Sequence, residues 1–216
     1  MNGRLATLTV DGIEVTVPAG TNVVDAARQA GVEIPVFCHH PCLEPVGACR
    51  MCLVEIGWPL FDSATGRVLL DETGRPAVRF GGKLEAACTT TVRDGMVVRC
   101  STPAVEKQRR ATLEFLLTSH PLDCPVCDKA GECPLQNLTM RYGPGTSRFE
   151  WSDKVRFAKP VPLGPLVVLD RERCVLCSRC IRFQEQLASD PVLAFQNRGR
   201  GMEVVSVSDP PFRSVL

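Results

Sequence analysis

The chain opens with apolar residues at every second position. The segments 8–10 and 13–17 both alternate in this way, and Asp11-Gly12 separates them. A period of two is typical of strands with one buried face, and Asp-Gly is a favoured two-residue hairpin turn. The pattern therefore predicts an antiparallel β-hairpin at the start of the chain.

A helical period follows the hairpin. Thr21 or Asn22 can cap a helix over residues 23–30, and Gly31 stands where a left-handed C-terminal cap is expected. Strands are predicted at 53–56 and 96–98, with an inserted hairpin or long surface loop over 57–84. These elements together fit a small mixed sheet packed on one helix.

A second helix is predicted from Thr102 to about Ser119. Pro103 occupies the favoured first helical position, and His120-Pro121 ends the helix. Residues 141–165 are rich in Gly and Pro and are predicted to form a linker, with a further unit beginning near Leu166.

Bulk composition narrows the class of protein. The chain has 216 residues, which suits one large domain or two to three small ones, and its formal charge of +1 argues against a dedicated nucleic-acid binder. The longest apolar run, 161–169, is broken by Pro and Gly, so no membrane insertion is expected. The N-terminus lacks the features of a signal peptide, and a cytosolic setting is expected.

The 12 cysteines are the unusual feature of the composition. A reducing cytosol does not favour disulfides, so clustered cysteines there indicate metal or redox chemistry. All but Cys42 and Cys100 belong to three short-spaced groups or complete one.

The first group is Cys38, Cys49, Cys52 and the distant Cys88. Plant-type ferredoxins hold a two-iron cluster with a cysteine loop, a CxxC pair and a remote fourth cysteine. A four-cysteine zinc site stays open as an alternative, and Cys42 competes with Cys38. A Rieske centre is excluded because the second half of the pattern is CxxC and supplies no histidine.

The second group is His120, Cys124, Cys127 and Cys133. A histidine at a helix end is ordinarily only a favourable charge, but these three cysteines otherwise lack a fourth ligand. A neutral imidazole in place of a thiolate should raise the potential of a four-iron cluster. Zinc bound by three cysteines and a histidine is the alternative.

The third group is Cys174, Cys177 and Cys180, and no cysteine follows it. The CxxCxxC spacing matches bacterial four-iron ferredoxins, in which the fourth cysteine comes from elsewhere. Four arginines flank the group and are expected to be solvated or to offset cluster charge: Arg171, Arg173, Arg179 and Arg182.

The order of the three groups, with a histidine in the second, resembles the N-terminal iron–sulfur region of the G subunit of respiratory NADH-quinone oxidoreductase, complex I. The resemblance covers essentially the whole chain, and its most specific stretches are 45–55, 119–129, 131–136 and 170–183.

The resemblance implies an α+β fold in three parts. A β-grasp, plant-type ferredoxin-like domain would span 1–100, and a four-iron domain with one histidine and three cysteine ligands would span 101–141. A linker over 142–165 would then lead to a bacterial-ferredoxin-like cluster domain over 166–216. It implies one 2Fe-2S cluster on Cys38, Cys49, Cys52 and Cys88, one 4Fe-4S cluster on His120, Cys124, Cys127 and Cys133, and a second on Cys174, Cys177 and Cys180.

In the family, the last cluster takes a fourth cysteine well downstream, ahead of a molybdopterin-oxidoreductase-like region. This sequence ends at Leu216 without either. The comparison predicts a truncated third domain whose cluster lacks one protein ligand.

The resemblance implies a subunit of an NADH:quinone oxidoreductase that relays single electrons from an NADH-oxidising flavoprotein toward quinone. Its partners would be other peripheral-arm subunits, at the cytoplasmic face of the plasma membrane. The chain has no GxGxxG after a strand, no P-loop and no nucleophile–base arrangement, so no catalytic residue is predicted.

Three alternatives stay open. The first is the diaphorase iron–sulfur subunit of an NAD-linked hydrogenase, or part of a formate dehydrogenase. The second is a zinc-stapled interaction module. The third, a disulfide-rich secreted scaffold, is disfavoured because no signal peptide is visible.

Overall fold

The computed structural model describes residues 4–207 and 214 of the chain. The chain forms two compact units. The first consists of Met1–Val36 and Cys49–Arg109, and the second of Phe37–Ala48 and Arg110–Leu216. The segment Phe37–Ala48 therefore leaves the first unit and returns to it.

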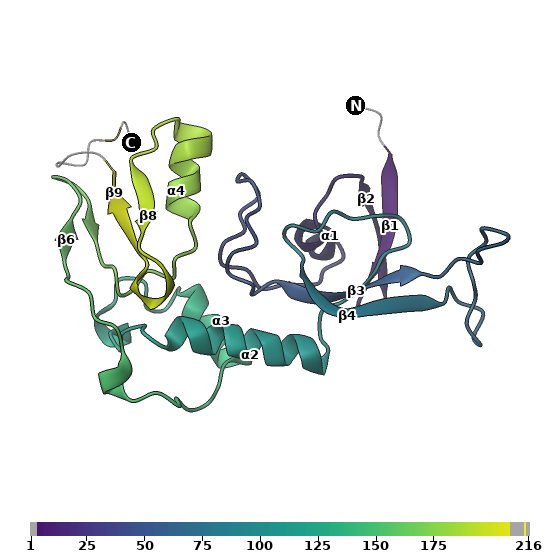
Figure 1. Ribbon diagram of the computed structural model, residues 1–216, viewed down its shortest axis with the longest axis horizontal. Helices are drawn as coiled ribbons and strands as arrows, with labels where there is room; N and C mark the ends of the chain where they lie inside the picture. The colour runs from purple at the N-terminus through teal and green to yellow at the C-terminus, as the bar shows by residue number, and fades with distance from the viewer. Residues whose placement is uncertain (1–3, 208–213, 215–216) are drawn as a thin grey trace. The chain divides into compact units, whose positions relative to one another are not determined.

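The first unit contains a five-stranded sheet, in the order β2-β1-β5-β3-β4. Figure 1 labels β1, β2, β3 and β4 of this sheet. Its strands are β1 (Leu5–Val10), β2 (Ile13–Pro18), β3 (Leu53–Pro59), β4 (Val78–Ala86) and β5 (Val97–Arg99). β1 pairs antiparallel with β2 and parallel with β5. Asp11 and Gly12 both take positive φ, at 45° and 86°, as a type I′ hairpin turn requires. The predicted hairpin is confirmed.

Helix α1 (Val23–Gln29) packs its apolar side into the core of this unit. Asn22 caps it, because its side-chain oxygen accepts a hydrogen bond from the Asp25 amide at 2.9 Å. Gly31 follows with φ of 75°, as predicted. The helix buries Val23, Val24, Ala26 and Ala27 in the same core as strand residues Leu8, Val10 and Val98.

The inserted hairpin is also confirmed, with longer strands than predicted. β3 continues to Pro59 and pairs antiparallel with β4, and residues 60–77 connect them. The pairing requires a glycine at position 57, because a Cβ there would lie 2.5 Å from Val78 Cγ1. The local pattern of residues 57–84 hid these extensions, since Gly, Pro and Arg interrupt the apolar period.

Helix α2 (Pro103–Leu117) carries the chain from the first unit into the second. The second unit then contains η1 (Cys124–Val126), α3 (Pro134–Tyr142), η2 (Trp151–Asp153), α4 (Arg179–Phe183), a π-helical turn η3 (Gln184–Ala188) and η4 (Gly199–Gly201). Two short hairpins complete it: β6 (Val161–Pro162) with β7 (Val168–Leu169), and β8 (Leu193–Gln196) with β9 (Glu203–Ser206). The expected linker is mostly irregular, although η2 and β6 lie inside it. Within residues 4–207, no helix is both long and apolar enough to cross a bilayer.

Candidate metal centres

Two cysteines of the first group lie at the end of one strand pair. Leu53 of β3 pairs with Ala86 of β4, and the Ala87 amide donates to the Cys52 carbonyl at 3.1 Å. Cys52 directly precedes β3, and Cys88 follows β4 by two residues, so the ladder brings their backbones together. Both cysteines are buried in the core of the first unit.

The other two cysteines of this group, Cys38 and Cys49, lie on the segment between α1 and β3. Cys49 is half-buried and precedes Arg50, whose φ of 59° turns the backbone between Cys49 and Cys52. Cys38 is buried and belongs to the Phe37–Ala48 segment of the second unit. Its place in the ligand set, like that of the other three, stays a prediction from the sequence.

A buried arginine holds the Cys38 loop within the second unit. Arg182 of α4 is 6% exposed, and its guanidinium donates to the Cys38 carbonyl, to the Glu44 carbonyl at 2.7 Å and to Ser178 Oγ at 3.0 Å. Arg179 adds a hydrogen bond to the His39 carbonyl at 2.6 Å. These arginines were expected to be solvated or to offset cluster charge. Solvation was wrong for Arg182, because its side chain is buried and donates to carbonyls 138 and 144 residues away.

The second group surrounds a cavity of about 150 Å³. His120, Cys124, Cys127 and Cys133 all line it, together with Leu117, Pro121, Ala130 and Leu135. His120 follows the end of α2, Cys124 begins η1, and Cys133 caps the N-terminus of α3. The ends of three elements therefore bring together all four residues that the sequence predicted as one ligand set.

The electrostatics of this cavity favour a neutral histidine. Partial burial lowers the pKa of His120, and the Lys154 ammonium lowers it further, while Asp123 and Asp170 act in the opposite direction. A neutral imidazole is the form that ligates a metal. Arg173 also lines the cavity and brings a positive charge.

The four residues fit a 4Fe-4S cluster. Such a cluster is held by four protein ligands around a cubane of finite size, so its ligands surround a hollow. Three thiols and an imidazole line the mainly apolar cavity here.

An ion-pair network joins the loop before Cys124 to the loop before Cys174. Lys159 Nζ pairs with Asp123 at 2.7 Å and also with Glu172. Arg173 bridges Asp123 at 3.4 Å and Asp170 at 3.1 Å. The network holds the two cysteine loops beside each other within the second unit.

The third group spans the turn that leads into α4, with Cys174 and Cys177 before the helix and Cys180 within it. Leu176 and Ser178 have φ of 54° and 59°, and their left-handed conformations wind the backbone around the CxxCxxC segment. The Leu176 amide donates to Cys174 Sγ at 3.4 Å. Burial raises the pKa of the Cys174 thiol, and the neighbouring cysteines add to that shift. Binding a cluster would therefore release a thiol proton.

The two unassigned cysteines have different surroundings. Cys42 is exposed, and its amide donates to His40 Nδ1 at 3.2 Å. Cys100 is buried against the sheet, and its amide donates to Asp11 Oδ1 at 2.7 Å. Burial, followed by the Asp11 charge, raises the pKa of Cys100 to about 12. Cys100 is thus an uncharged core thiol.

Family models match three successive parts of the chain. Residues 3–103 match a 2Fe-2S iron–sulfur cluster binding domain, and residues 109–148 match the NADH-ubiquinone oxidoreductase-G iron–sulfur binding region. Residues 164–216 match the ferredoxin-like domain of NADH-quinone oxidoreductase subunit 3. With the sheet and helices described above, these matches show an α+β iron–sulfur fold.

Curated relatives carry the same description. The chain is 48% identical over 97% of its length to the NADH-quinone oxidoreductase G subunit of Streptomyces coelicolor, and 46% identical over 98% to that of Mycobacterium tuberculosis. It is 45% identical over 86% to NADH-quinone oxidoreductase subunit 3 of Thermus thermophilus. The chain spans only 22%, 24% and 25% of the length of these three relatives.

A solved structure has a similar fold. The chain resembles a chain of NAD+-reducing [NiFe]-hydrogenase in its H2-reduced state, with a TM-score of 0.73 and 28% identity. The match covers 94% of this chain and 75% of the other. Sequence identity is higher to the oxidoreductase subunits. Two of the family models describe iron–sulfur binding regions, and the third describes a ferredoxin-like domain. The chain belongs to the family of NADH-quinone oxidoreductase G subunits and corresponds to their iron–sulfur region.

Proposed function

We propose that this chain relays single electrons through iron–sulfur clusters as part of an NADH:quinone oxidoreductase. The observation that carries the proposal is the cavity of about 150 Å³ lined by His120, Cys124, Cys127 and Cys133. Together with the family match over residues 109–148, this arrangement supports a 4Fe-4S cluster with one histidine ligand.

The proposal assigns three clusters to three successive parts of the fold. The β-grasp, plant-type ferredoxin-like part would hold a 2Fe-2S cluster on Cys38, Cys49, Cys52 and Cys88. The part around the His120 cavity would hold the first 4Fe-4S cluster. The bacterial-ferredoxin-like part would hold a second one on Cys174, Cys177 and Cys180, whose fourth ligand is not assigned. The burial of Cys52 and Cys88 at the end of the β3–β4 pair supports the first assignment.

The clusters supply the redox chemistry, and the protein holds them at fixed positions and sets their surroundings. His120, kept neutral, makes its cluster less negative than four thiolates would. The network of Lys159, Asp123, Glu172 and Arg173 keeps the two four-iron loops together. Electrons would enter from a flavoprotein that oxidises NADH and leave toward quinone through other subunits of a membrane-associated complex.

A diaphorase iron–sulfur subunit of an NAD-linked hydrogenase is the second candidate. The similarity to the NAD+-reducing [NiFe]-hydrogenase supports it. The oxidoreductase assignment is preferred because identity reaches 48% for the Streptomyces coelicolor relative and 28% for the hydrogenase chain.

Reduction by NADH through a flavoprotein tests the proposal. The reconstituted chain, mixed anaerobically with NADH alone, should keep its clusters oxidised. Adding the NADH-oxidising flavoprotein subunit of an NADH-quinone oxidoreductase should reduce them, as followed by visible bleaching and EPR. Clusters that dithionite reduces but the NADH–flavoprotein pair does not would contradict the proposed place in the electron path.

A further inference from the structure

The end of helix α2 lacks a cation of its own. The last turn of α2 contains no basic residue, although its terminal carbonyls carry the negative end of the helix dipole. His120 lies three residues beyond this end and lines the cavity together with the three cysteines of its group. The stability of the α2 terminus therefore bears directly on where the imidazole points.

Lys154, from a distant part of the second unit, supplies the missing cation. Its Nζ donates to the carbonyls of Leu117 at 2.9 Å, His120 at 2.9 Å and Thr118 at 3.3 Å. A lysine ammonium has three N–H donors, so all three are engaged by one turn of backbone. Lys154 thereby caps α2 and fixes the carbonyl of His120 itself.

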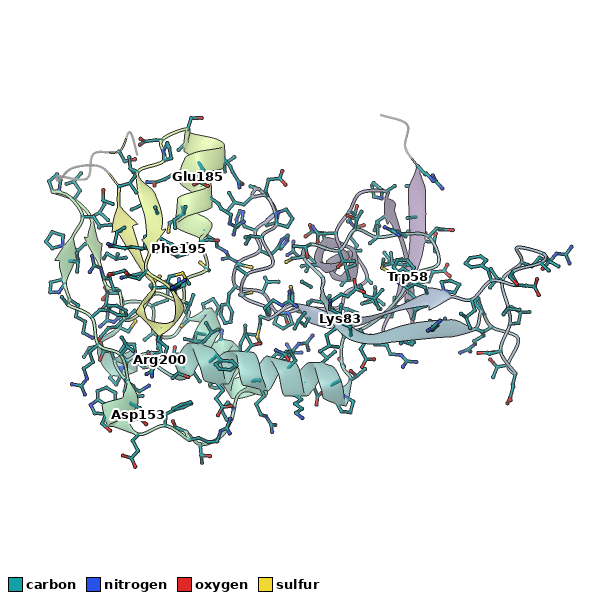
Figure 2. The ribbon with its side chains drawn as sticks, viewed as in Figure 1. Trp58, Lys83, Asp153, Glu185, Phe195 and Arg200 are labelled. Atoms are coloured by element: carbon teal, nitrogen blue, oxygen red, sulfur yellow. The ribbon has the colours of Figure 1, made fainter. Side chains whose placement is uncertain are left out.

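The segment that carries Lys154 is also fixed. Glu150 and Asp153 form a capping box around η2, and the Val155 amide donates to Ser119 Oγ at 3.3 Å. Arg200 donates to the Asp153 carbonyl and to Ser119 Oγ at 3.4 Å. Asp153 and Arg200 are labelled in Figure 2. Hydrogen bonds thus fix both neighbours of Lys154 in the chain, Asp153 and Val155, and keep its ammonium at the end of α2.

We infer that Lys154 is a positioning residue for the His120 iron ligand, and that its charge raises the potential of the histidine-ligated cluster. The inference rests on the proposed function, since it needs a cluster in the cavity. Reduction adds a negative charge to a cluster, and a fixed positive charge nearby favours the reduced form. Hydrogen bonds from the same ammonium hold the turn that presents the imidazole.

The test compares Lys154→Met with Lys154→Arg in the reconstituted full chain. EPR-monitored redox titration gives the midpoint potentials of the four-iron and two-iron clusters in the same sample. Lys154→Met should lower the equilibrium constant for reduction of the histidine-ligated four-iron cluster about tenfold, which is a shift of about 59 mV to lower potential. The potential of the two-iron cluster should stay unchanged. Lys154→Arg keeps the positive charge, so its midpoint potentials should be close to those of the unmodified chain.

A matched control removes one positive charge from the exposed side of the same helix. Lys107 of α2 is exposed, and Lys107→Met should leave both potentials unchanged. Selective loss of the four-iron cluster in Lys154→Met, restored in Lys154→Arg, would also support the positioning role.

Two results would overturn the inference: a four-iron potential and occupancy unaffected by Lys154→Met, or equal shifts in both clusters. Absence of any four-iron signal in the unmodified chain would instead contradict the proposed function. The two failures are therefore distinguishable.

Discussion

Replacing Arg182 by methionine should loosen the loop that carries Cys38. The change keeps an unbranched side chain but removes every donor that the guanidinium supplies to the Cys38 and Glu44 carbonyls. A hydrogen bond from a charged donor contributes about 1.5–3 kcal/mol. The Cys38 bond is buried and should lose that full amount, whereas Glu44 is exposed and water can replace part of its bond. The expected loss is about 2–4 kcal/mol of local stability.

Amide hydrogen exchange of the reconstituted protein measures this loss at the loop itself. The Leu43 amide donates to the His40 carbonyl at 3.1 Å, and the Glu44 amide donates to Gln186 Oε1 at 2.9 Å. Both amides lie in the peptide 37–48 and should exchange through local opening. A loss of about 2–4 kcal/mol corresponds to exchange roughly 30- to 700-fold faster, since 1.4 kcal/mol is a factor of ten.

The control is Arg198→Met, which removes an exposed arginine of the same unit and should leave this peptide unchanged. Equal protection of peptide 37–48 in Arg182→Met and in the unmodified chain would contradict the role of Arg182 in holding this loop. Uniform loss of protection across both units would also refute it, because the effect is expected to be local.

Residues elsewhere in the two units give four further predictions. His120→Cys should retain a four-iron cluster but lower its potential, since a thiolate adds negative charge; an unchanged or raised potential in an EPR titration would argue against His120 as a ligand. At pH 8 in the folded protein, iodoacetamide should modify the exposed Cys42 and leave Cys100 intact, as peptide mass spectrometry would show; modification of Cys100 at the rate of Cys42 would contradict its burial. The pKa of Cys100 is raised from 9.0 to about 12, so the uncharged thiol contributes fully to stability below pH 9 and this contribution is lost between pH 9 and about 12. Cys100→Ala should therefore show a smaller decline of the unfolding midpoint over this pH range. An identical decline in both proteins would contradict the raised pKa. Gly57→Ala should destabilise the first unit by about 1–3 kcal/mol, because the new methyl would lie 2.5 Å from Val78 Cγ1. An unchanged denaturant midpoint would contradict this prediction and show that β3 and β4 move apart at little cost.

Local signals in the sequence were sufficient for the first hairpin and for α1. The alternation over 8–17 with Asp11-Gly12 specifies both the strands and a turn with positive φ, and the caps of α1 lie next to it in sequence. The extensions of β3 and β4 were missed because they depend on cross-strand pairing, which local periodicity does not report.

The sequence predicted the candidate ligands, but it did not identify the residues that position them. The spacing of Cys124, Cys127 and Cys133 was visible along the chain because all three lie on one short segment, and His120 precedes it directly. Lys154 and Arg182 were not recognised as positioning residues, because their hydrogen bonds reach backbone carbonyls more than thirty residues away. A backbone carbonyl has no sequence signature, so only the folded chain identifies such partners.

Iron, acid-labile sulfide and zinc counted in the anaerobically reconstituted chain, alongside low-temperature EPR of the reduced protein, test most directly whether the chain carries iron–sulfur clusters. We expect at least about 6 irons with matching sulfide, and the signals of one two-iron and one four-iron cluster. About 10 irons would mean that the third cluster has also found a fourth ligand. Stoichiometric zinc without sulfide would contradict electron transfer by this chain and indicate a zinc-stapled module.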